Sequence, residues 1–157
     1  MVRKASPLFL FAFTACLIAA DQMTKFFARN LAESITVIKD FFYLTFVMNF
    51  GVAFGLLQGF NNVVVWLYVA VIGLIMLFYE KLPKDSFSQM MLFMIVAGII
   101  GNFTDRIVFG YVTDFISFAF WPSFNLADLY IVAGIAGIII KDAFWLEKTN
   151  GKMPVRK

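Results

Sequence analysis

The sequence predicts an all-α membrane protein with four transmembrane helices and a small β-rich insert. Of its 157 residues, 62% are hydrophobic and only 15% are charged. A soluble domain of this length carries more charge and fewer than the 21 phenylalanines found here. Most apolar residues lie in four stretches close to the length of about 20 residues that crosses a bilayer. We therefore expect one integral membrane domain covering residues 1–157.

The first apolar stretch, about residues 7–27, follows the basic residues Arg3 and Lys4. About 19 residues in a helix reach roughly 28 Å, which is enough to cross the hydrocarbon core. A cleaved signal peptide is the alternative, because residues 18–20 end in small side chains. The apolar run passes Cys16 without a break and further spans follow it, so we expect a retained transmembrane helix.

Residues 35–58 differ in composition from the expected spans. Up to residue 54, β-branched and aromatic residues dominate, interrupted by Lys39 and Asp40. This composition favours strands over a spanning helix. From Asn49 onward, small residues mix with aromatic ones, which indicates a turn leading into a short surface helix. Residues 59–62 are expected to form a loop.

Three more spans are expected at about residues 63–79, 88–103 and 126–145. A tight charged turn at residues 80–86 separates the second from the third. Residues 107–123 contain Gly110 and Pro122, and we interpret them as an irregular re-entrant or interfacial segment. Gly98 in the third span offers the small surface that allows close helix packing.

The distribution of lysine and arginine predicts the orientation in the membrane. With both termini in the cytoplasm, nine basic residues lie in inner segments: Arg3, Lys4, Lys81, Lys84, Lys141, Lys148, Lys152, Arg156 and Lys157. Four lie outside: Lys25, Arg29, Lys39 and Arg106. This bias favours cytoplasmic termini. The polar residues of the third and fourth spans then face the outer side, together with Asp21 and Asn49.

The composition also excludes several kinds of chemistry. The chain has no histidine, which removes Ser-His-Asp and Cys-His catalysis and His-ligated zinc. Its one cysteine, Cys16, lies inside an apolar run and indicates neither an intramolecular disulfide nor a metal site. The basic residues form no stripe of the kind that binds nucleic acid. We expect no cofactor and no metal, and without histidine any acid–base chemistry has to come from carboxylates, lysine, tyrosine or serine.

Most of the polar residues have an adequate structural explanation. Asp21 and Lys25 are four residues apart on one helix face and predict an ion pair. Three residues of the third span, Asn102, Asp105 and Arg106, share a face and predict a hydrogen-bonded, ion-paired cluster that closes this span. Asn125 is a good N-cap for the fourth span, and Asp128 in its first turn suits the helix dipole.

Asp114 is different, because it stands alone among bulky apolar residues with no neighbouring cation and no helix to cap. Asp128 is its nearest downstream carboxylate. Two carboxylates in a partly dehydrated pocket do not both ionise easily, so one supplies an acid and the other a base. Activation of water by such a pair is the hydrolytic design still open to this chain. A proton or ion pathway using the same carboxylates is the alternative, and a structural scaffold is a third interpretation.

Five motifs resemble, in order, the signature blocks of the bacterial lipoprotein signal peptidases, or signal peptidase II. They are Asp21-Gln22-Met23-Thr24-Lys25, Asn49-x-Gly51-x-Ala53-Phe54, Gly101-Asn102-x-x-Asp105-Arg106, Val112-Thr113-Asp114-Phe115 and Phe124-Asn125-x-Ala127-Asp128. Each block alone is weak, but five in the family's order over four expected spans are a specific match. Thr113 departs from the valine expected before the aspartate, a nearly isosteric change.

The resemblance implies an aspartyl endopeptidase of the bacterial inner membrane that removes signal peptides from prolipoproteins before a diacylglyceryl-modified cysteine. It implies Asp114 and Asp128 as the catalytic pair. The supporting positions that it implies are Asp21, Lys25, Asn49, Gly51, Gly98, Asn102, Asp105, Arg106 and Asn125. It also implies an extracytoplasmic β-cradle at residues 35–54 with a short mobile helix, and sensitivity to globomycin-type inhibitors. We expect a monomer that contacts membrane lipids and has its site near the outer leaflet.

Overall fold

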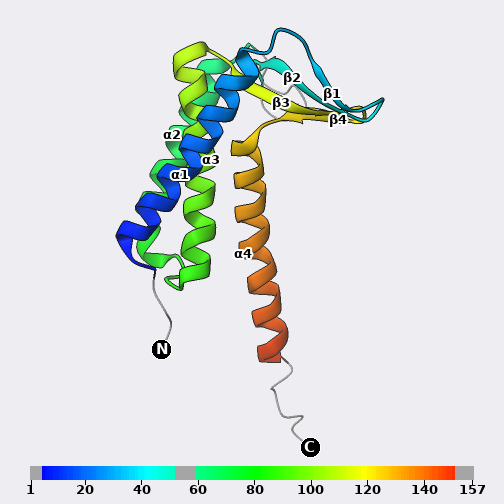
Figure 1. Ribbon diagram of the computed structural model, residues 1–157. Coiled ribbons are helices and arrows are strands. Elements are labelled where there is room, and N and C mark those ends of the chain that lie inside the picture. The colour runs from blue at the N-terminus through cyan, green and yellow to red at the C-terminus, as the bar shows by residue number, and fades with distance from the viewer. Residues whose placement is uncertain (1–4, 52–58, 151–157) are drawn as a thin grey trace, which may run out of the picture.

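The computed structural model describes residues 5–51 and 59–150, which form long helices with an antiparallel sheet at one end (Figure 1). The helices are α1 (Pro7–Arg29), α2 (Asn61–Leu77), α3 (Ser86–Phe109) and α4 (Leu126–Asn150), with a short 3-10 turn at Tyr79–Lys81. The strands are β1 (Ile35–Ile38), β2 (Phe42–Asn49), β3 (Val112–Phe118) and β4 (Trp121–Phe124). The start of α1 and the end of α4 both lie at the end away from the sheet (Figure 1).

Local capping signals define the helix ends. The side chain of Ser6 accepts a hydrogen bond from the Phe9 amide at 3.1 Å at the start of α1, where Pro7 suits the first helical position. The Asp85 side chain caps α3 in the same way by accepting from the Ser88 amide at 3.0 Å. At its other end α3 stops at Gly110, whose φ of 79° is left-handed and therefore suits glycine.

The sheet has the strand order β1-β2-β3-β4, with antiparallel neighbours throughout. Its central pair, β2 and β3, places Val47 opposite Asp114 and Asn49 opposite Val112. The pairing therefore brings Asn49 beside a carboxylate that is 65 residues away in the sequence. The sheet projects sideways from one end of the helices, and β3 leads from α3 towards the start of α4 through β4 (Figure 1).

The interpretation of residues 107–123 as an irregular re-entrant segment is wrong. Helix α3 continues to Phe109, and the segment then forms the hairpin of β3 and β4. The partner that stabilises β3 is β2, which is remote in sequence, and pairing on both sides of β3 overrides the irregular appearance of the segment. The sheet is therefore built from two separate parts of the chain rather than from residues 35–58 alone.

The helices also differ from the expected ranges at their ends. Helix α3 begins at Ser86 and is longer than predicted at both ends, α2 begins at Asn61 inside the expected loop, and α4 continues to Asn150. At its C-terminal end α3 extends more than one helical turn beyond the expected residue 103, so Asp105 and Arg106 remain helical. The short surface helix expected after Asn49 falls in residues 52–58 and lies outside the described residues.

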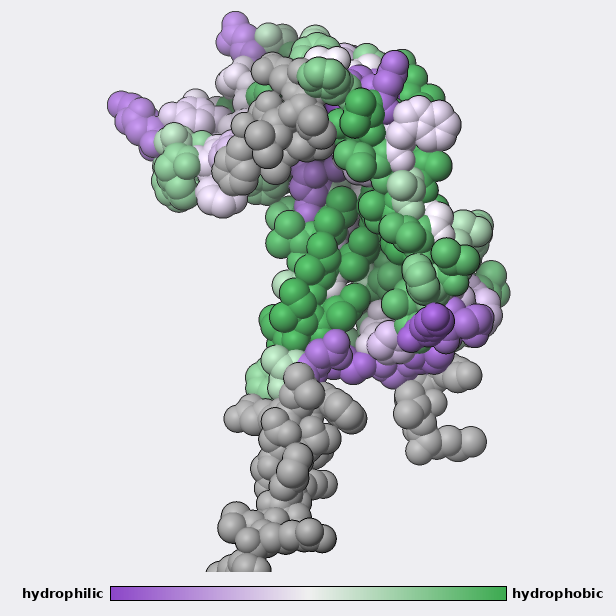
Figure 2. Space-filling model, turned by 180° about the vertical axis from the view of Figure 1, so that it is seen from behind, coloured by the Kyte–Doolittle hydropathy of each residue, from purple (hydrophilic) through white to green (hydrophobic). Residues whose placement is uncertain are grey.

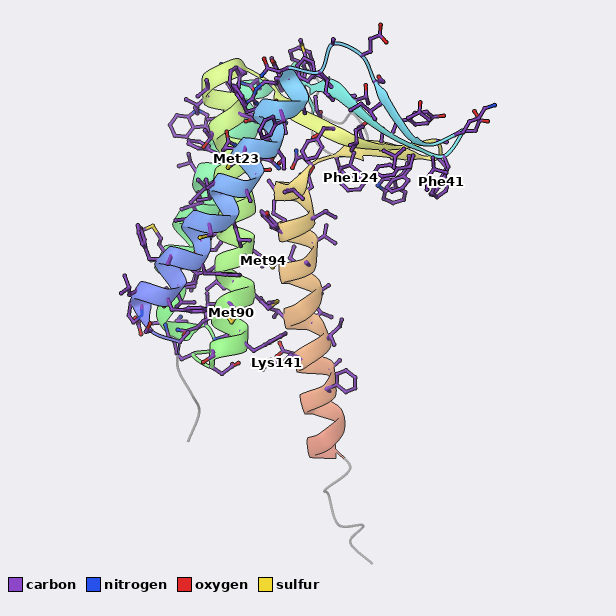
Figure 3. All side chains as sticks on the ribbon, viewed as in Figure 1. Met23, Phe41, Met90, Met94, Phe124 and Lys141 are labelled. Atoms are coloured by element: carbon purple, nitrogen blue, oxygen red, sulfur yellow. The ribbon has the colours of Figure 1, made fainter. Side chains whose placement is uncertain are left out.

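Helix α3 is the centre of the helical layer and packs against α1, α2 and α4. A side chain at Gly98 would collide with the Ala127 carbonyl oxygen and the Ile131 side chain, so this glycine lets α3 approach α4 closely. The packing role predicted for Gly98 is therefore confirmed. At the opposite end, Lys141 of α4 reaches towards the start of α3 and pairs with Asp85 (Figure 3).

The surface of the helices is apolar where a soluble protein would be polar. Leu8 is 77% exposed, Trp66 70% and Met76 73%. In the described part of the chain, buried polar side chains are about as frequent as buried apolar ones, the reverse of a soluble core. Figure 2 shows an apolar belt over the helices with hydrophilic residues at both ends. By length and composition α1 and α3 are candidate membrane spans, while α2 is apolar but shorter.

Candidate active site

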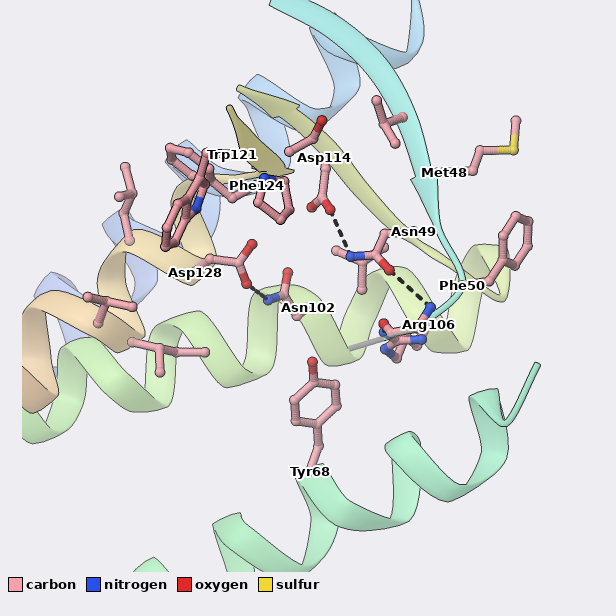
Figure 4. Close-up of a pocket in the computed structure, with 18 residues that line it drawn as sticks. Met48, Asn49, Phe50, Tyr68, Asn102, Arg106, Asp114, Trp121, Phe124 and Asp128 are labelled. Atoms are coloured by element: carbon pink, nitrogen blue, oxygen red, sulfur yellow. Dashed lines mark hydrogen bonds between the residues drawn. The ribbon is translucent and has the colours of Figure 1, made fainter. Parts of the chain in front are cut away.

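A cavity of about 680 Å³ opens where the sheet meets the helices. Strands β2, β3 and β4 and helices α2, α3 and α4 all contribute to its wall. The wall is mostly apolar, with Phe124, Ile131 and Val132 among its residues. Two carboxylates, Asp114 of β3 and Asp128 of α4, face into it (Figure 4). The pairing predicted for these two aspartates thus has a geometric basis, because they line one cavity.

Each aspartate is held by neutral N–H donors. Asp114, which is only 1% exposed, accepts from the Asn49 amide nitrogen at 2.8 Å and from that of Asn125 at 2.7 Å. The half-buried Asp128 accepts from the Asn102 amide nitrogen at 2.8 Å. In the described part of the chain neither carboxylate takes part in an ion pair. Among the described residues, the two cavity carboxylates therefore have neutral hydrogen-bond partners and no ion-pair partner.

Asn125 and Asp128 cap α4 reciprocally. The Asn125 side-chain oxygen accepts from the Asp128 amide at 3.0 Å, and the second oxygen of Asp128 accepts from the Asn125 amide at 3.2 Å. This arrangement corresponds to a capping box and confirms the structural explanation given for both residues. It occupies only one oxygen of Asp128. The other oxygen is the one bonded to Asn102, in the cavity.

A buried charge cluster lies behind the cavity. Lys25 of α1 pairs with Asp21 at 2.9 Å, as the spacing predicted, and lies 3.6 Å from Asp105 of α3. All three side chains are fully buried. Asp21 accepts from the Ala127 amide at 2.9 Å, and Asp105 accepts from the Thr113 amide at 2.8 Å. The cluster therefore holds the backbone immediately before each cavity aspartate.

Arg106 binds the segment that follows β2. Its guanidinium donates to the Gly51 carbonyl oxygen and to the Asn61 side chain at the start of α2, the latter at 3.0 Å. The Gly51 amide in turn donates to Asn49 at 3.0 Å. Asp105 and Arg106 thus bind partners on other elements, and the cluster predicted to close the third span instead connects α3 to α1, α2 and the sheet.

The described residues therefore place the predicted site residues in three positions. Six line the cavity: Asn49, Gly51, Asn102, Arg106, Asp114 and Asp128. Four lie directly behind it: Asp21, Lys25, Asp105 and Asn125. Gly98 lies at the contact between α3 and α4 and is not part of the cavity wall.

Burial raises the pKa of Asp114 from its ordinary value of 3.8 to about 7. The charge of Asp128 adds to the rise, and the N–H donors of Asn49 and Asn125 oppose it. Near neutral pH this carboxyl therefore retains a proton far more readily than an ordinary aspartate does. Among the described residues, no group of three or more His, Cys, Asp or Glu side chains has a geometry that could hold a metal ion.

Sequence reasoning missed three residues at the site. Arg29 donates to the Thr113 hydroxyl at 2.8 Å, lies 3.6 Å from Asp105 and stacks on the Phe109 ring at 4.3 Å. Its position four residues after Lys25, on the same helix face, was a usable signal. Tyr68 and Trp121 also line the cavity, and the Tyr68 hydroxyl points towards it from α2 (Figure 4). No local pattern marked these two aromatic residues.

The Thr113 hydroxyl has a specific partner in this structure. The side chain is fully buried and accepts the hydrogen bond from Arg29. The departure from valine thus adds a buried acceptor that an isosteric valine lacks.

Comparison with known proteins identifies the family. The family model described as signal peptidase (SPase) II matches residues 13–144, which is most of the chain. The chain belongs to the signal peptidase II family. Enzymes of this family are aspartic peptidases that act on prolipoproteins, and the chain is assigned this activity with its family.

Named relatives agree with this assignment. The lipoprotein signal peptidase of Fusobacterium nucleatum is 40% identical over 154 residues, which cover 94% of this chain and 93% of the relative. That of Caldanaerobacter subterraneus is 44% identical over 126 residues, 76% of this chain and 86% of the relative. The lipoprotein signal peptidase of Halothermothrix orenii is 40% identical over 126 residues, which cover 78% of this chain and 87% of the relative. These relatives give the transport interpretation no support.

Two solved structures of bacterial membrane enzymes share the fold. The first has a TM-score of 0.84 and 27% identity, with 100% of this chain and 99% of the other covered. The second has a TM-score of 0.77 and 28% identity, and the match covers 90% of this chain and 96% of the other. This signal peptidase II homologue is therefore a membrane enzyme with the fold of known membrane enzymes.

Proposed function

We propose that Asp114 and Asp128 are the catalytic pair of this signal peptidase II. The observation that carries the proposal is that two carboxylates from separate elements line one mostly apolar cavity, and that neither makes an ion pair within the described part of the chain. Such a pair retains one proton near neutral pH, because two neighbouring charges in a dehydrated site repel each other. The pair then contains an acid and a base at the same time.

The chemistry follows from this shared proton. The ionised carboxylate accepts a proton from a water molecule as that water attacks the scissile carbonyl carbon. The protonated carboxyl donates to the carbonyl oxygen, which gives a neutral tetrahedral intermediate. Collapse of the intermediate breaks the C–N bond and transfers a proton to the leaving amine. Asn49, Asn102 and Asn125 hold the carboxylates through N–H donors, and this fixes their orientation during the reaction.

We further propose that all four helices cross the membrane, with both termini in the cytoplasm and the sheet on the outer side. At 1.5 Å per residue the 17 residues of α2 reach roughly 26 Å and the 25 residues of α4 roughly 38 Å. Both lengths are compatible with a bilayer core of about 30 Å, given local thinning and tilt. The basic residues of the inner segments support this orientation. The active site then lies near the outer leaflet.

The cavity also supports the proposed substrate. Tyr68 of α2 and Ile131 and Val132 of α4 line it from the helical layer. We propose that a signal helix in the bilayer reaches the aspartates from this side. An apolar wall of this kind suits a diacylglyceryl-modified cysteine, whose two acyl chains stay in the surrounding lipid. We propose that globomycin-type inhibitors occupy the same cavity, and that one monomer contains the complete site.

The test uses the purified full-length chain in a bilayer mimetic with one prolipoprotein prepared in two forms. We expect cleavage on the amino side of the diacylglyceryl-modified cysteine and no cleavage of the unmodified precursor. Neither chelators nor serine-protease reagents should change the rate. Equal cleavage of both precursor forms would contradict the proposed substrate. A proteoliposome flux assay on the same preparation tests the transport alternative, which predicts proton or ion movement without cleavage.

The rate of cleavage should fall as the pH rises through about 7. Below this pH the Asp114 carboxyl holds the proton that the pair needs, and above it the proton is lost. The same sign applies to stability: the folded pKa lies above the unfolded one, so the contribution of this group is lost as the pH rises. A profile of kcat/KM on both sides of neutrality checks this expectation. A rate that keeps rising well into the alkaline range would contradict it.

A further inference from the structure

The buried ammonium group of Lys25 contacts side chains that lead to both cavity aspartates. The Lys25 side chain is fully buried, and its Nζ lies 2.9 Å from Asp21 Oδ2, 2.9 Å from Asn102 Oδ1 and 3.6 Å from Asp105 Oδ2. An ammonium has three N–H donors and no acceptor. Three acceptors therefore surround three donors. Lys25 does not line the cavity, so any effect on the reaction has to pass through these neighbours.

Lys25 determines which way the Asn102 carboxamide faces. Because Nζ can only donate, the atom of Asn102 that faces it has to be the oxygen. The amide nitrogen then points the other way, 2.8 Å from Asp128 Oδ1. In many structures the oxygen and nitrogen of an asparagine are exchangeable assignments. Here a donor-only cation on one side and a carboxylate on the other fix the orientation.

The same orientation extends to Asn125 and Asp114. The Asn125 amide nitrogen lies 3.2 Å from Asn102 Oδ1 and 2.7 Å from Asp114 Oδ1, so it donates to both. Asn102 Oδ1 accepts from Lys25 and Asn125 together. If Asn102 turned over, its nitrogen would face two groups that only donate, and its oxygen would face a carboxylate oxygen. The Asn125 oxygen is itself fixed by the Asp128 amide. Lys25 therefore sets the N–H donor at Asp128 through Asn102, and the same Asn102 oxygen gives the Asn125 donor at Asp114 a second acceptor.

The backbone beside the two aspartates depends on the same cation. Asp21 accepts from the amide of Ala127, and Asp105 accepts from the amide of Thr113. These residues immediately precede Asp128 and Asp114. Lys25 lies between the two accepting carboxylates and compensates their charge. It therefore links the start of β3 to the start of α4.

We propose that Lys25 is a positioning residue of the catalytic pair. It fixes the orientation of the Asn102 carboxamide, which directs an N–H donor to Asp128 and gives the Asn125 donor at Asp114 a second acceptor, and it bridges the two carboxylates that hold the backbone beside the aspartates. The inference rests on the proposed function, in which these two aspartates are catalytic. The substrate cavity itself is not touched by Lys25, so its loss affects the chemical step and leaves substrate binding unchanged.

The test measures kcat and KM for diacylated prolipoprotein cleavage by the Lys25→Met enzyme, which keeps the side-chain length and removes the charge. We expect kcat to fall about 100-fold with KM within about threefold of wild type. Lys141→Met is the matched control, because it removes a lysine–aspartate pair at the far end of α3 and α4. This control should keep both constants within about twofold of wild type.

A second variant separates positioning from charge balance. Lys25→Met/Asp21→Asn removes one buried charge of each sign, so we expect it to be destabilised less than the single variant, which leaves Asp21 buried without its cation. Positioning predicts that kcat stays low in this double variant, since Asn102 has still lost its donor-only partner. Recovery of wild-type kcat in the double variant overturns the proposal. So does a folded Lys25→Met enzyme whose kcat is unchanged, or whose loss lies entirely in KM.

The proposed catalytic pair is tested separately in the same assay. If Asp114→Asn is inactive while Lys25→Met keeps its kcat, only the positioning role is wrong. If Asp114→Asn keeps wild-type activity, the assignment of the pair is wrong, and the positioning role is overturned with it.

Discussion

Replacing Asp114 with asparagine should lower kcat for prolipoprotein cleavage by about 10³-fold or more while the protein still folds. The change keeps the shape of the side chain and removes the group that holds or accepts the proton. General acid–base catalysis by one group contributes about 10²–10⁴-fold. The measurement is single-turnover cleavage of a diacylglyceryl-modified precursor in a bilayer mimetic.

The folded state of this variant provides its own control. The pKa of Asp114 is raised by burial to about 7, so ionisation at alkaline pH destabilises the wild-type fold. Asparagine does not ionise, so we expect the melting temperature of the Asp114→Asn protein, relative to wild type, to rise as the pH increases through about 7. A difference in melting temperature that does not change with pH would contradict this account.

Replacing Asp105 with alanine should destabilise the protein by about 3 kcal/mol. Its carboxylate is fully buried and accepts from the Thr113 amide at 2.8 Å, while Lys25 and Arg29 each lie 3.6 Å away. Alanine leaves a buried N–H without its acceptor and two cations with less compensating charge. For a chain of this length the melting temperature should fall by roughly 10 °C.

Asp142→Ala is the matched control for this measurement. Asp142 is an exposed carboxylate near the far end of α4, and its loss should change the melting temperature by only about 1–2 °C. Asp105→Asn should lie between the two, because its side-chain oxygen still accepts from the Thr113 amide. Equal melting temperatures for Asp105→Ala and Asp142→Ala would contradict the role given to the buried cluster.

The parts of the site that depend on local geometry could be predicted from the sequence. The Asp21–Lys25 pair follows from a spacing of four residues, and the structure contains it at 2.9 Å. The Asn125 cap follows from an asparagine before an apolar helix, and it is present with Asp128 as its reciprocal partner. The close contact at Gly98 follows from a small residue within a span.

The parts that depend on tertiary pairing could not be predicted in this way. The strand at Val112–Phe118 is stabilised by β2, some 65 residues earlier, so the segment appears irregular in isolation. Asp105 was assigned to a cluster at the end of one span, but its partners come from α1 and β3. Arg29 lay next to a recognised pair in the helix and was missed because its acceptor, Thr113, is 84 residues away.

Asp114 stands out in both the sequence and the structure. It had no local explanation in the sequence, and in the structure it lies in a cavity wall with its carboxylate held only by neutral amides. Asp128 caps α4 and also lines the cavity. Because the capping role alone accounts for a carboxylate at this position, the sequence indicated a catalytic role for Asp128 less clearly than for Asp114.

The most direct test of the account compares Asp114→Asn, Asp128→Asn and the double variant in single-turnover cleavage of one diacylated precursor. If the two aspartates act as one unit, each single variant loses about 10³-fold or more, and the double variant is no slower than the singles. If either single variant stays within about tenfold of the wild-type rate, the two aspartates are not the catalytic pair.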